Sequence, residues 1–249
     1  MTQTGEPSLI SDIRYFLGGQ YRYLEGLHEL DAFGRRLAFW LNTERISLGA
    51  YHSLYLLFSP SLKAGDVVYS DIAAFWWHRY VSVGVPRAFP NMANALSLGR
   101  TRTCEAMCAL RPQDKARIEA ACRHVEAVGD SIRFTVLEST LKASILRAAV
   151  TIGVFPGPSH LYVSIEDRIS GTLRESPPMP IGFYDAAFDL AGRIRQEADE
   201  IVLEARTSSR AAYVAREFDW PLRIAIATFS PLRSGAAYTP RVRRFAKAA

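Results

Sequence analysis

Two apolar stretches decide the fold class: YHSLYLLF, from Tyr51 to Phe58, and FWWHRYVSVGV, from Phe75 to Val85. Both are rich in aromatic and β-branched residues, and prolines lie close to them at Pro60 and Pro86. We therefore expect two strands. The connection is too long for a tight hairpin, so we expect it to hold either a short helix or an additional strand at Asp66–Tyr69.

Helical periodicity flanks these strands. From Gln20 to Leu41, apolar residues recur at helical spacing opposite a charged side, which predicts an amphipathic helix weakened by Gly26 and Gly34. A second helical signal covers Asn94 to Val128. A proline in its middle is best placed as the first residue of a new helix, and Gly129 suits the C-terminal cap.

The second half of the chain carries weaker signals. We expect, in order, a helix, two strands, a long helix and a last strand: Phe134–Ala149, Thr151–Phe155, His160–Glu166, Phe183 to about Arg206, and Leu222–Phe229. The stretch SPPMP, from Ser176 to Pro180, is the strongest loop signal.

These elements favour an α+β fold with a mostly antiparallel sheet covered by amphipathic helices. The 249 residues suit a single compact domain over 1–249, or two packed halves, 1–129 and 130–249, with a loop at 176–180. Similarity between SLYLLF and HLYVSI leaves an internal duplication open, although chance resemblance between apolar strands is the favoured interpretation.

Composition indicates the cellular compartment in which the protein works. The net charge is +5, and nearly all basic residues are arginines scattered among acidic ones. The start of the chain lacks the pattern of a secretory signal, and no apolar run approaches the roughly 20 residues that span a bilayer. An odd set of three cysteines fits a reducing compartment. We expect a cytoplasmic protein with no membrane association.

The soft ligands of the chain lie in one segment: Cys104, Cys108, Cys122 and His124. Cys104 and Cys108 share a helix face, whereas Cys122 and His124 point in nearly opposite directions, so at most three can converge. We expect buried core cysteines and no metal or other cofactor. The HExxH, GxSxG and phosphate-loop patterns do not occur in the sequence.

The most unusual stretch contains the candidate binding residues Trp76, Trp77, His78, Arg79 and Tyr80. Alternation along a strand predicts that Trp77 and Arg79 share one face while Trp76, His78 and Tyr80 share the other. Tryptophan, tyrosine and arginine dominate the hot spots of protein interfaces. A partner-binding sheet face is one interpretation, and two aromatic layers buried under helices are the other.

Three functional classes stay open. The leading hypothesis is a non-catalytic cytosolic protein-binding module that inhibits or regulates a partner protein, as antitoxins and immunity proteins do. The second is an enzyme acting on a small molecule, with His78, Arg79, Tyr80 and Glu166 as first candidates. The third is a nucleic-acid binder that uses its arginines and the basic C-terminal end.

Overall fold

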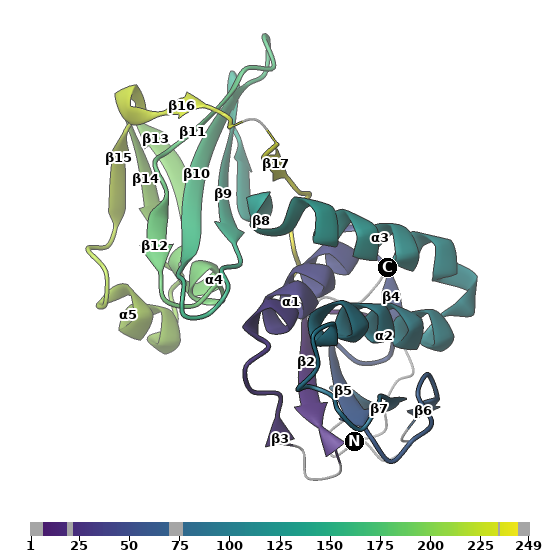
Figure 1. The fold of residues 1–249 in the computed structure, drawn as a ribbon. Coiled ribbons are helices and arrows are strands. Elements are labelled where there is room, and N and C mark those ends of the chain that lie inside the picture. Colours follow the sequence, from purple (N-terminus) through teal and green to yellow (C-terminus); the bar gives the residue numbers. More distant parts are fainter. Residues whose placement is uncertain (1–6, 19–21, 70–76, 234, 244–249) are drawn as a thin grey trace. The chain divides into compact units, whose positions relative to one another are not determined.

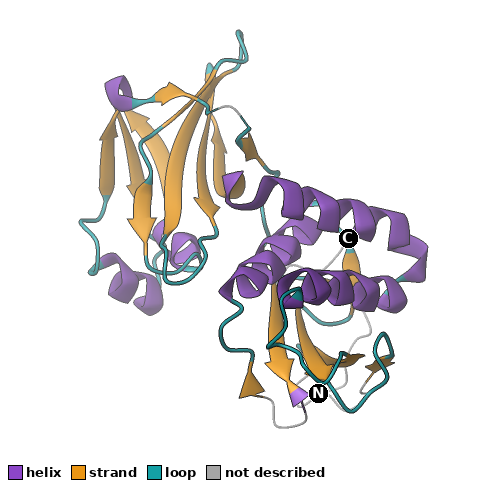
Figure 2. Cartoon of the chain, in the orientation of Figure 1, coloured by secondary structure: helices purple, strands orange, loops and turns teal. Residues whose placement is uncertain are grey.

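The computed structural model describes residues 7–18, 22–69, 77–233 and 235–243, and it confirms the predicted α+β class (Figures 1 and 2). The chain divides into two compact units. Unit 1 comprises the described residues up to Gly129 together with Arg243, and unit 2 comprises Asp130–Val242. Helices and mostly antiparallel strands occur in both units.

The main sheet of unit 1 has five strands in the order β3 (Arg22–Tyr23), β2 (Asp12–Leu17), β5 (Ser53–Ser59), β7 (His78–Gly84) and β6 (Val67–Tyr69). The three central strands are parallel, and the two edge strands are antiparallel to their neighbours. A separate pair joins β1 (Ser8–Leu9) to β4 (Ser47–Gly49). The strands predicted on either side of the connection are thus confirmed at β5 and β7, and the connection holds the additional strand β6.

The helices of unit 1 are α1 (His28–Thr43), α2 (Ala95–Leu110) and α3 (Lys115–Val128). The predicted break between the last two is confirmed as a 3₁₀ turn at Pro112–Asp114, and Gly129 follows α3 with φ 58°. The first helix begins later than the sequence predicts, because Gly26 adopts φ 80° and the preceding residues form β3.

Helices cover one face of the main sheet in unit 1. The Tyr15 ring of β2 lies directly under Gly34 of α1, with its Cε2 and hydroxyl oxygen 2.6 Å from the place that a Cβ would occupy. Thr103 of α2 donates a hydrogen bond to the Tyr15 hydroxyl over 3.3 Å. The side chains that point toward these helices are almost wholly buried: Ile13, Tyr15, Leu54, Leu56, Phe58, Val81 and Val83. This face is the apolar core of unit 1.

The large sheet of unit 2 runs in the order β16 (Ser230–Pro231), β11 (Leu173–Glu175), β10 (Ser159–Asp167), β9 (Ser144–Thr151), β8 (Ile132–Thr140) and β17 (Ala237–Tyr238), and β12 (Met179–Ile181) also pairs with β10. All pairs are antiparallel except β17 with β8. A three-stranded sheet joins β13 (Arg193–Glu197), β14 (Glu200–Glu204) and β15 (Leu222–Ala225), and two short helices complete the unit, α4 (Ala186–Leu190) and α5 (Ser209–Ala215).

Two predicted helices of unit 2 are wrong. The segment Phe134–Ala149 forms the hairpin β8–β9, whose residues pair across the strands and are buried on both faces at the start of β8 and the end of β9. The segment from Phe183 to Arg206 forms α4 followed by the hairpin β13–β14, which turns at Ala198 with φ 50°. When both faces of a strand are buried, runs of alanine, isoleucine and leucine fit the helical period of 3.6 residues as well as the strand period of two.

Smaller differences concern the ends of elements. The strand expected at Thr151–Phe155 is wrong beyond Thr151, which ends β9, whereas His160–Glu166 is confirmed within β10. The predicted loop Ser176–Pro180 is shorter, because β12 begins at Met179, and it lies inside unit 2. The last strand ends at Ala225, where a 3₁₀ turn follows. Among the helices that the structure describes, none has the length and apolarity needed to cross a membrane.

Candidate functional site

The face of the unit 1 sheet opposite the helices carries a group of rings that we call the aromatic array. Its members come from β2, β3, β5 and the start of β7: Phe16, Tyr23, Tyr55, Trp77, His78 and Tyr80. Alternation places them on one face, since Phe16 pairs with Tyr23, and Tyr55 with Tyr80. Val68 of β6 pairs with Ser82 and extends the same face to the far edge.

Tyr55 is the centre of the aromatic array. Its ring centroid lies 5.4 Å from that of Phe16, 6.1 Å from Trp77 and 5.4 Å from Tyr80. The His78 ring stacks on it at 4.9 Å. These separations are typical of favourable tilted and edge-to-face pairs. The rings therefore form one connected layer across three parallel strands.

A cation completes this layer. The Arg14 guanidinium lies over the Tyr55 ring, 5.7 Å from its centroid, and its Nε donates to Asp12 over 2.5 Å. Burial raises the pKa of the Tyr55 hydroxyl, and Arg14 opposes this rise because it favours the phenolate. Tyr55 is thus uncharged near neutral pH and presents a ring with one polar end.

The aromatic array has a buried part and a part that is accessible to solvent. Phe16, Tyr55 and His78 are buried. Trp77 and Tyr80 are half-buried, and Tyr23 is 58% exposed. Buried rings thus support aromatic side chains that reach the surface.

The structure brings together only part of the predicted binding stretch. Trp77, His78 and Tyr80 belong to the aromatic array, whereas Trp76 lies outside the described residues. Arg79 faces the other side of β7, where its guanidinium lies 5.8 Å from the centroid of the Tyr51 ring. The prediction that Trp77 and Arg79 share a face is wrong, because β7 begins at His78 and Trp77 precedes the regular alternation.

Sequence reasoning missed the members of the array that lie on other strands. Phe16 and Tyr55 are the buried partners of the predicted residues, and Arg14 caps them. The alternation in DIRYFL, over Asp12–Leu17, was the signal that could have placed Arg14 and Phe16 on one face. The parallel pairing that sets β2 beside β5 has no local signature.

The residues considered for small-molecule catalysis lie on different strand faces and in different units. His78 and Tyr80 share the aromatic array, and Arg79 points away from them. Glu166 belongs to β10 of unit 2, where Arg147 pairs with it over 2.5 Å and also with Glu138 over 2.8 Å. This arrangement explains Glu166 as part of a surface ion-pair ladder.

The three cysteines meet between α2 and α3 as free thiols. Interaction with the Cys122 thiol lowers the pKa of Cys104, and burial opposes this shift. The Cys108 thiol donates to the Lys115 carbonyl over 3.9 Å. Burial raises the pKa of Cys108 to about 12. His124 instead stacks on Trp40 at 4.0 Å. Throughout the described ranges, no group of three or more His, Cys, Asp or Glu side chains has the geometry to hold a metal ion.

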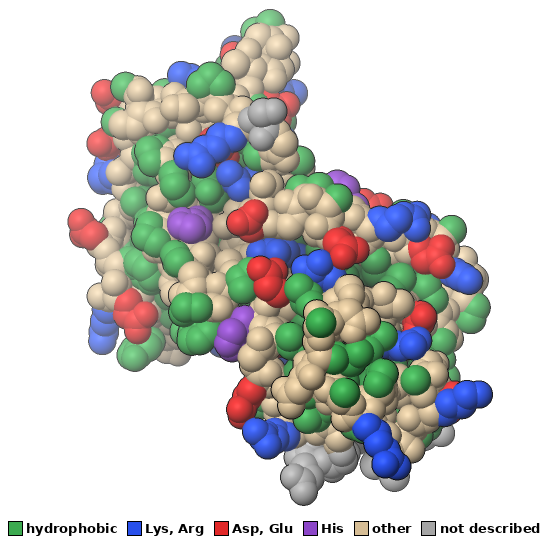
Figure 3. Space-filling view, viewed as in Figure 1, with side chains coloured by type: hydrophobic (Ala, Val, Ile, Leu, Met, Phe, Trp, Pro, Cys, Tyr) green, Lys and Arg blue, Asp and Glu red, His purple; other side chains and the backbone are tan. Residues whose placement is uncertain are grey.

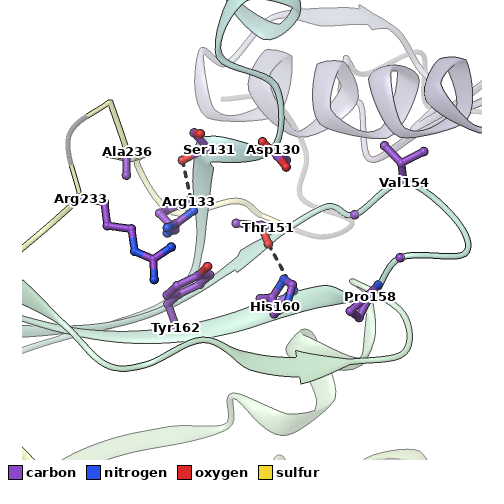
Figure 4. A pocket seen from close by; sticks show the side chains of 12 residues that line it. Asp130, Ser131, Arg133, Thr151, Val154, Pro158, His160, Tyr162, Arg233 and Ala236 are labelled. Carbon is purple, nitrogen blue, oxygen red and sulfur yellow. Dashed lines mark hydrogen bonds between the residues drawn. The ribbon is translucent and has the colours of Figure 1, made fainter. Parts of the chain in front are cut away.

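Unit 2 contains a pocket of about 510 Å³ over the β8, β9 and β10 strands (Figure 4). Its polar lining includes hydroxyl, imidazole and guanidinium groups: Ser131, Arg133, Thr151, His160 and Arg233. Tyr162 forms an aromatic wall, and the loop with Gly153 and Gly157 closes one side. This size lies within the usual range for small-molecule sites.

Arg133, which lines this pocket, is fixed by Glu175 and Tyr162. Its Nε donates to Glu175 over 3.2 Å, and both side chains are only 5% exposed. The guanidinium lies 3.8 Å from the centroid of the Tyr162 ring. The Tyr238 hydroxyl donates to the same Glu175 oxygen over 3.3 Å. The planar cation is thus held in a single orientation.

No protein-family model, curated protein or solved structure matches this chain.

Proposed function

We propose that the chain is a non-catalytic cytosolic protein-binding module that inhibits or regulates a partner protein, in the manner of antitoxins and immunity proteins. The aromatic array carries this proposal. Tyr23, Tyr80 and Trp77 offer large apolar area with few rotatable bonds, so ordering them on binding costs little entropy. The three free thiols support a reducing compartment.

The chemistry of the array indicates what the partner presents. Rings with a polar end, together with the 41% exposed Arg14 side chain, suit an apolar patch bordered by acidic or carbonyl oxygens. The exposed edge residue Val68, which pairs with Ser82, extends the apolar surface along β6. We therefore expect a partner interface with an apolar centre and a polar rim.

The arginines support the nucleic-acid alternative less well. Arginines of both units are engaged with carboxylates, for example Arg100 with Glu126, Arg147 with Glu166 and Arg210 with Asp189. On the face shown in Figure 3, basic and acidic side chains are interspersed. A surface that binds the phosphate backbone of a nucleic acid instead requires basic groups gathered along one stripe.

The test is capture of partners by the tagged full chain from source cells, at moderate and high salt. We expect one stoichiometric protein that stays bound at high salt. Combined Tyr23→Ala and Tyr80→Ala substitutions should weaken its capture by about 100-fold, since hot-spot truncations cost about 2 kcal/mol or more.

Tyr213→Ala is the matched control, because Tyr213 is a 66% exposed tyrosine on α5 of unit 2. Capture that this control reduces as much as the array variant would contradict the assigned surface. Recovery of nucleic acid that salt releases, with no protein, would instead favour the third functional class.

A further inference from the structure

The pocket of unit 2 gathers polar groups from three neighbouring strands in one row. His160 of β10 pairs with Thr151 of β9, and the pairing of Phe134 with Val150 sets Arg133 of β8 beside Thr151. All three side chains line the pocket. Figure 4 shows Arg133, Thr151 and His160 around one hollow, with Arg233 reaching toward it from the C-terminal segment.

Arg133 and Thr151 in this row still have N–H and O–H groups that can donate hydrogen bonds to a ligand. A guanidinium carries five N–H donors, and the bonds of Arg133 to Glu175 and to the Ser131 carbonyl use one on Nε and one on Nη1. The Thr151 hydroxyl oxygen accepts from the His160 backbone N–H over 3.2 Å, which leaves the hydroxyl proton to be donated. The row can thus donate several further bonds to an acceptor.

Arg233 supplies the charge. It is exposed, and its guanidinium makes no hydrogen bond or ion pair with any residue that the structure describes. It lines both the pocket and an adjoining hollow of about 190 Å³, which share Tyr162 as a wall. Glu175 offsets the charge of Arg133, and Asp130, the carboxylate among the lining residues, is exposed to water.

We infer that this pocket binds a small organic molecule through an oxyanion, a carboxylate or a phosphate. Arg233 contacts the oxyanion as the exposed cation of the lining, and the N–H donors of Arg133 and the Thr151 hydroxyl orient the oxyanion. Guanidinium groups match the geometry of both oxyanions. The inference goes beyond the protein-binding proposal and does not depend on it, because the aromatic array belongs to unit 1.

Calorimetric titration of the full chain tests the inference, at one ionic strength set with chloride. The probes are phenyl phosphate, benzoate and the uncharged benzyl alcohol. We expect saturable binding of at least one anion and about tenfold weaker binding, or none, for the alcohol. Binding of phenyl phosphate alone assigns a phosphate, and binding of benzoate alone assigns a carboxylate.

Arg233→Gln removes the charge and keeps hydrogen-bonding capacity, so it should weaken anion binding by about tenfold. Arg206→Gln is the matched control, because Arg206 is an exposed arginine of unit 2 that does not line the pocket. Two results would overturn the inference: neither anion binds, or an anion binds equally well to the Arg233→Gln variant.

Discussion

The two units differ in what they place on the sheet face that is not packed into the core. Unit 1 sets aromatic rings there, with Tyr55 as their centre and Arg14 above it. Unit 2 sets a buried ion pair, Arg133 with Glu175, and a polar pocket there. Rings gain binding energy from any well-shaped apolar surface, whereas oriented donors select one kind of acceptor. We accordingly propose macromolecular recognition for unit 1 and small-ligand recognition for unit 2.

The largest expected effect comes from breaking the ion pair of unit 2. Arg133→Met leaves the Glu175 carboxylate buried without its cation, which should lower the free energy of unfolding by about 3–5 kcal/mol. Urea-induced unfolding measures this loss.

A second substitution controls for lost packing. Adding Glu175→Gln removes the unpaired charge while the side-chain oxygen still accepts from Tyr238, so the double variant should regain most of the loss. A double variant as unstable as Arg133→Met would show that packing, rather than charge, holds this face together.

The next effect comes from the helix-covered face of unit 1. Gly34→Ala improves helix propensity, yet its Cβ would lie 2.6 Å from ring atoms of Tyr15. We expect a net loss of about 1–3 kcal/mol from overpacking, measured by thermal and urea unfolding. Gly34→Ala combined with Tyr15→Leu should recover part of this loss. A stabilised single variant would show that the face is less tightly packed than the structure indicates.

The smallest effect concerns the buried imidazole of the aromatic array. Burial lowers the pKa of His78 below its ordinary value of 6.5, so the unfolded chain binds a proton more readily than the folded one. Stability should therefore fall as the pH drops below the unfolded value, by at most about 1.4 kcal/mol per pH unit for this group.

Unfolding of the His78→Gln variant, measured between about pH 7.5 and 5.5, isolates this contribution because the other histidines are shared with the wild type. The variant should lose less stability than the wild type over this range. Equal pH slopes for the two proteins would mean that His78 titrates as if it were exposed.

Local sequence signals predicted the helices of unit 1 better than the strands of unit 2. Pro112 and Gly129 mark real helix boundaries, because proline fixes φ and lacks an N–H donor, whereas glycine adopts a positive φ without strain. The segment Phe134–Ala149 was misread because residues on both faces are buried at the start of β8 and at the end of β9, which obscures the alternation of apolar and polar residues typical of a strand. Fold class and the strands β10 and β15 could be predicted, whereas the hairpins β8–β9 and β13–β14 could not.

The candidate sites depend on pairings that no local pattern encodes. The rings from Trp77 to Tyr80 could be singled out, but their partners Phe16 and Tyr55 lie on other strands of a parallel sheet. The pocket of unit 2 joins Arg133, Thr151, His160 and Arg233, which are up to one hundred positions apart in the sequence. Such convergence follows from topology and becomes visible only in the folded chain.

The most direct test of the central claim is photo-crosslinking in source cells, with a benzophenone amino acid placed at position 23, 80 or 213. Tyr23 and Tyr80 belong to the aromatic array of unit 1, and Tyr213 is the exposed control in unit 2. The account predicts that the same protein crosslinks from positions 23 and 80 and not from 213. Absence of a shared crosslinked protein at the two array positions, or equal crosslinking from position 213, would contradict it.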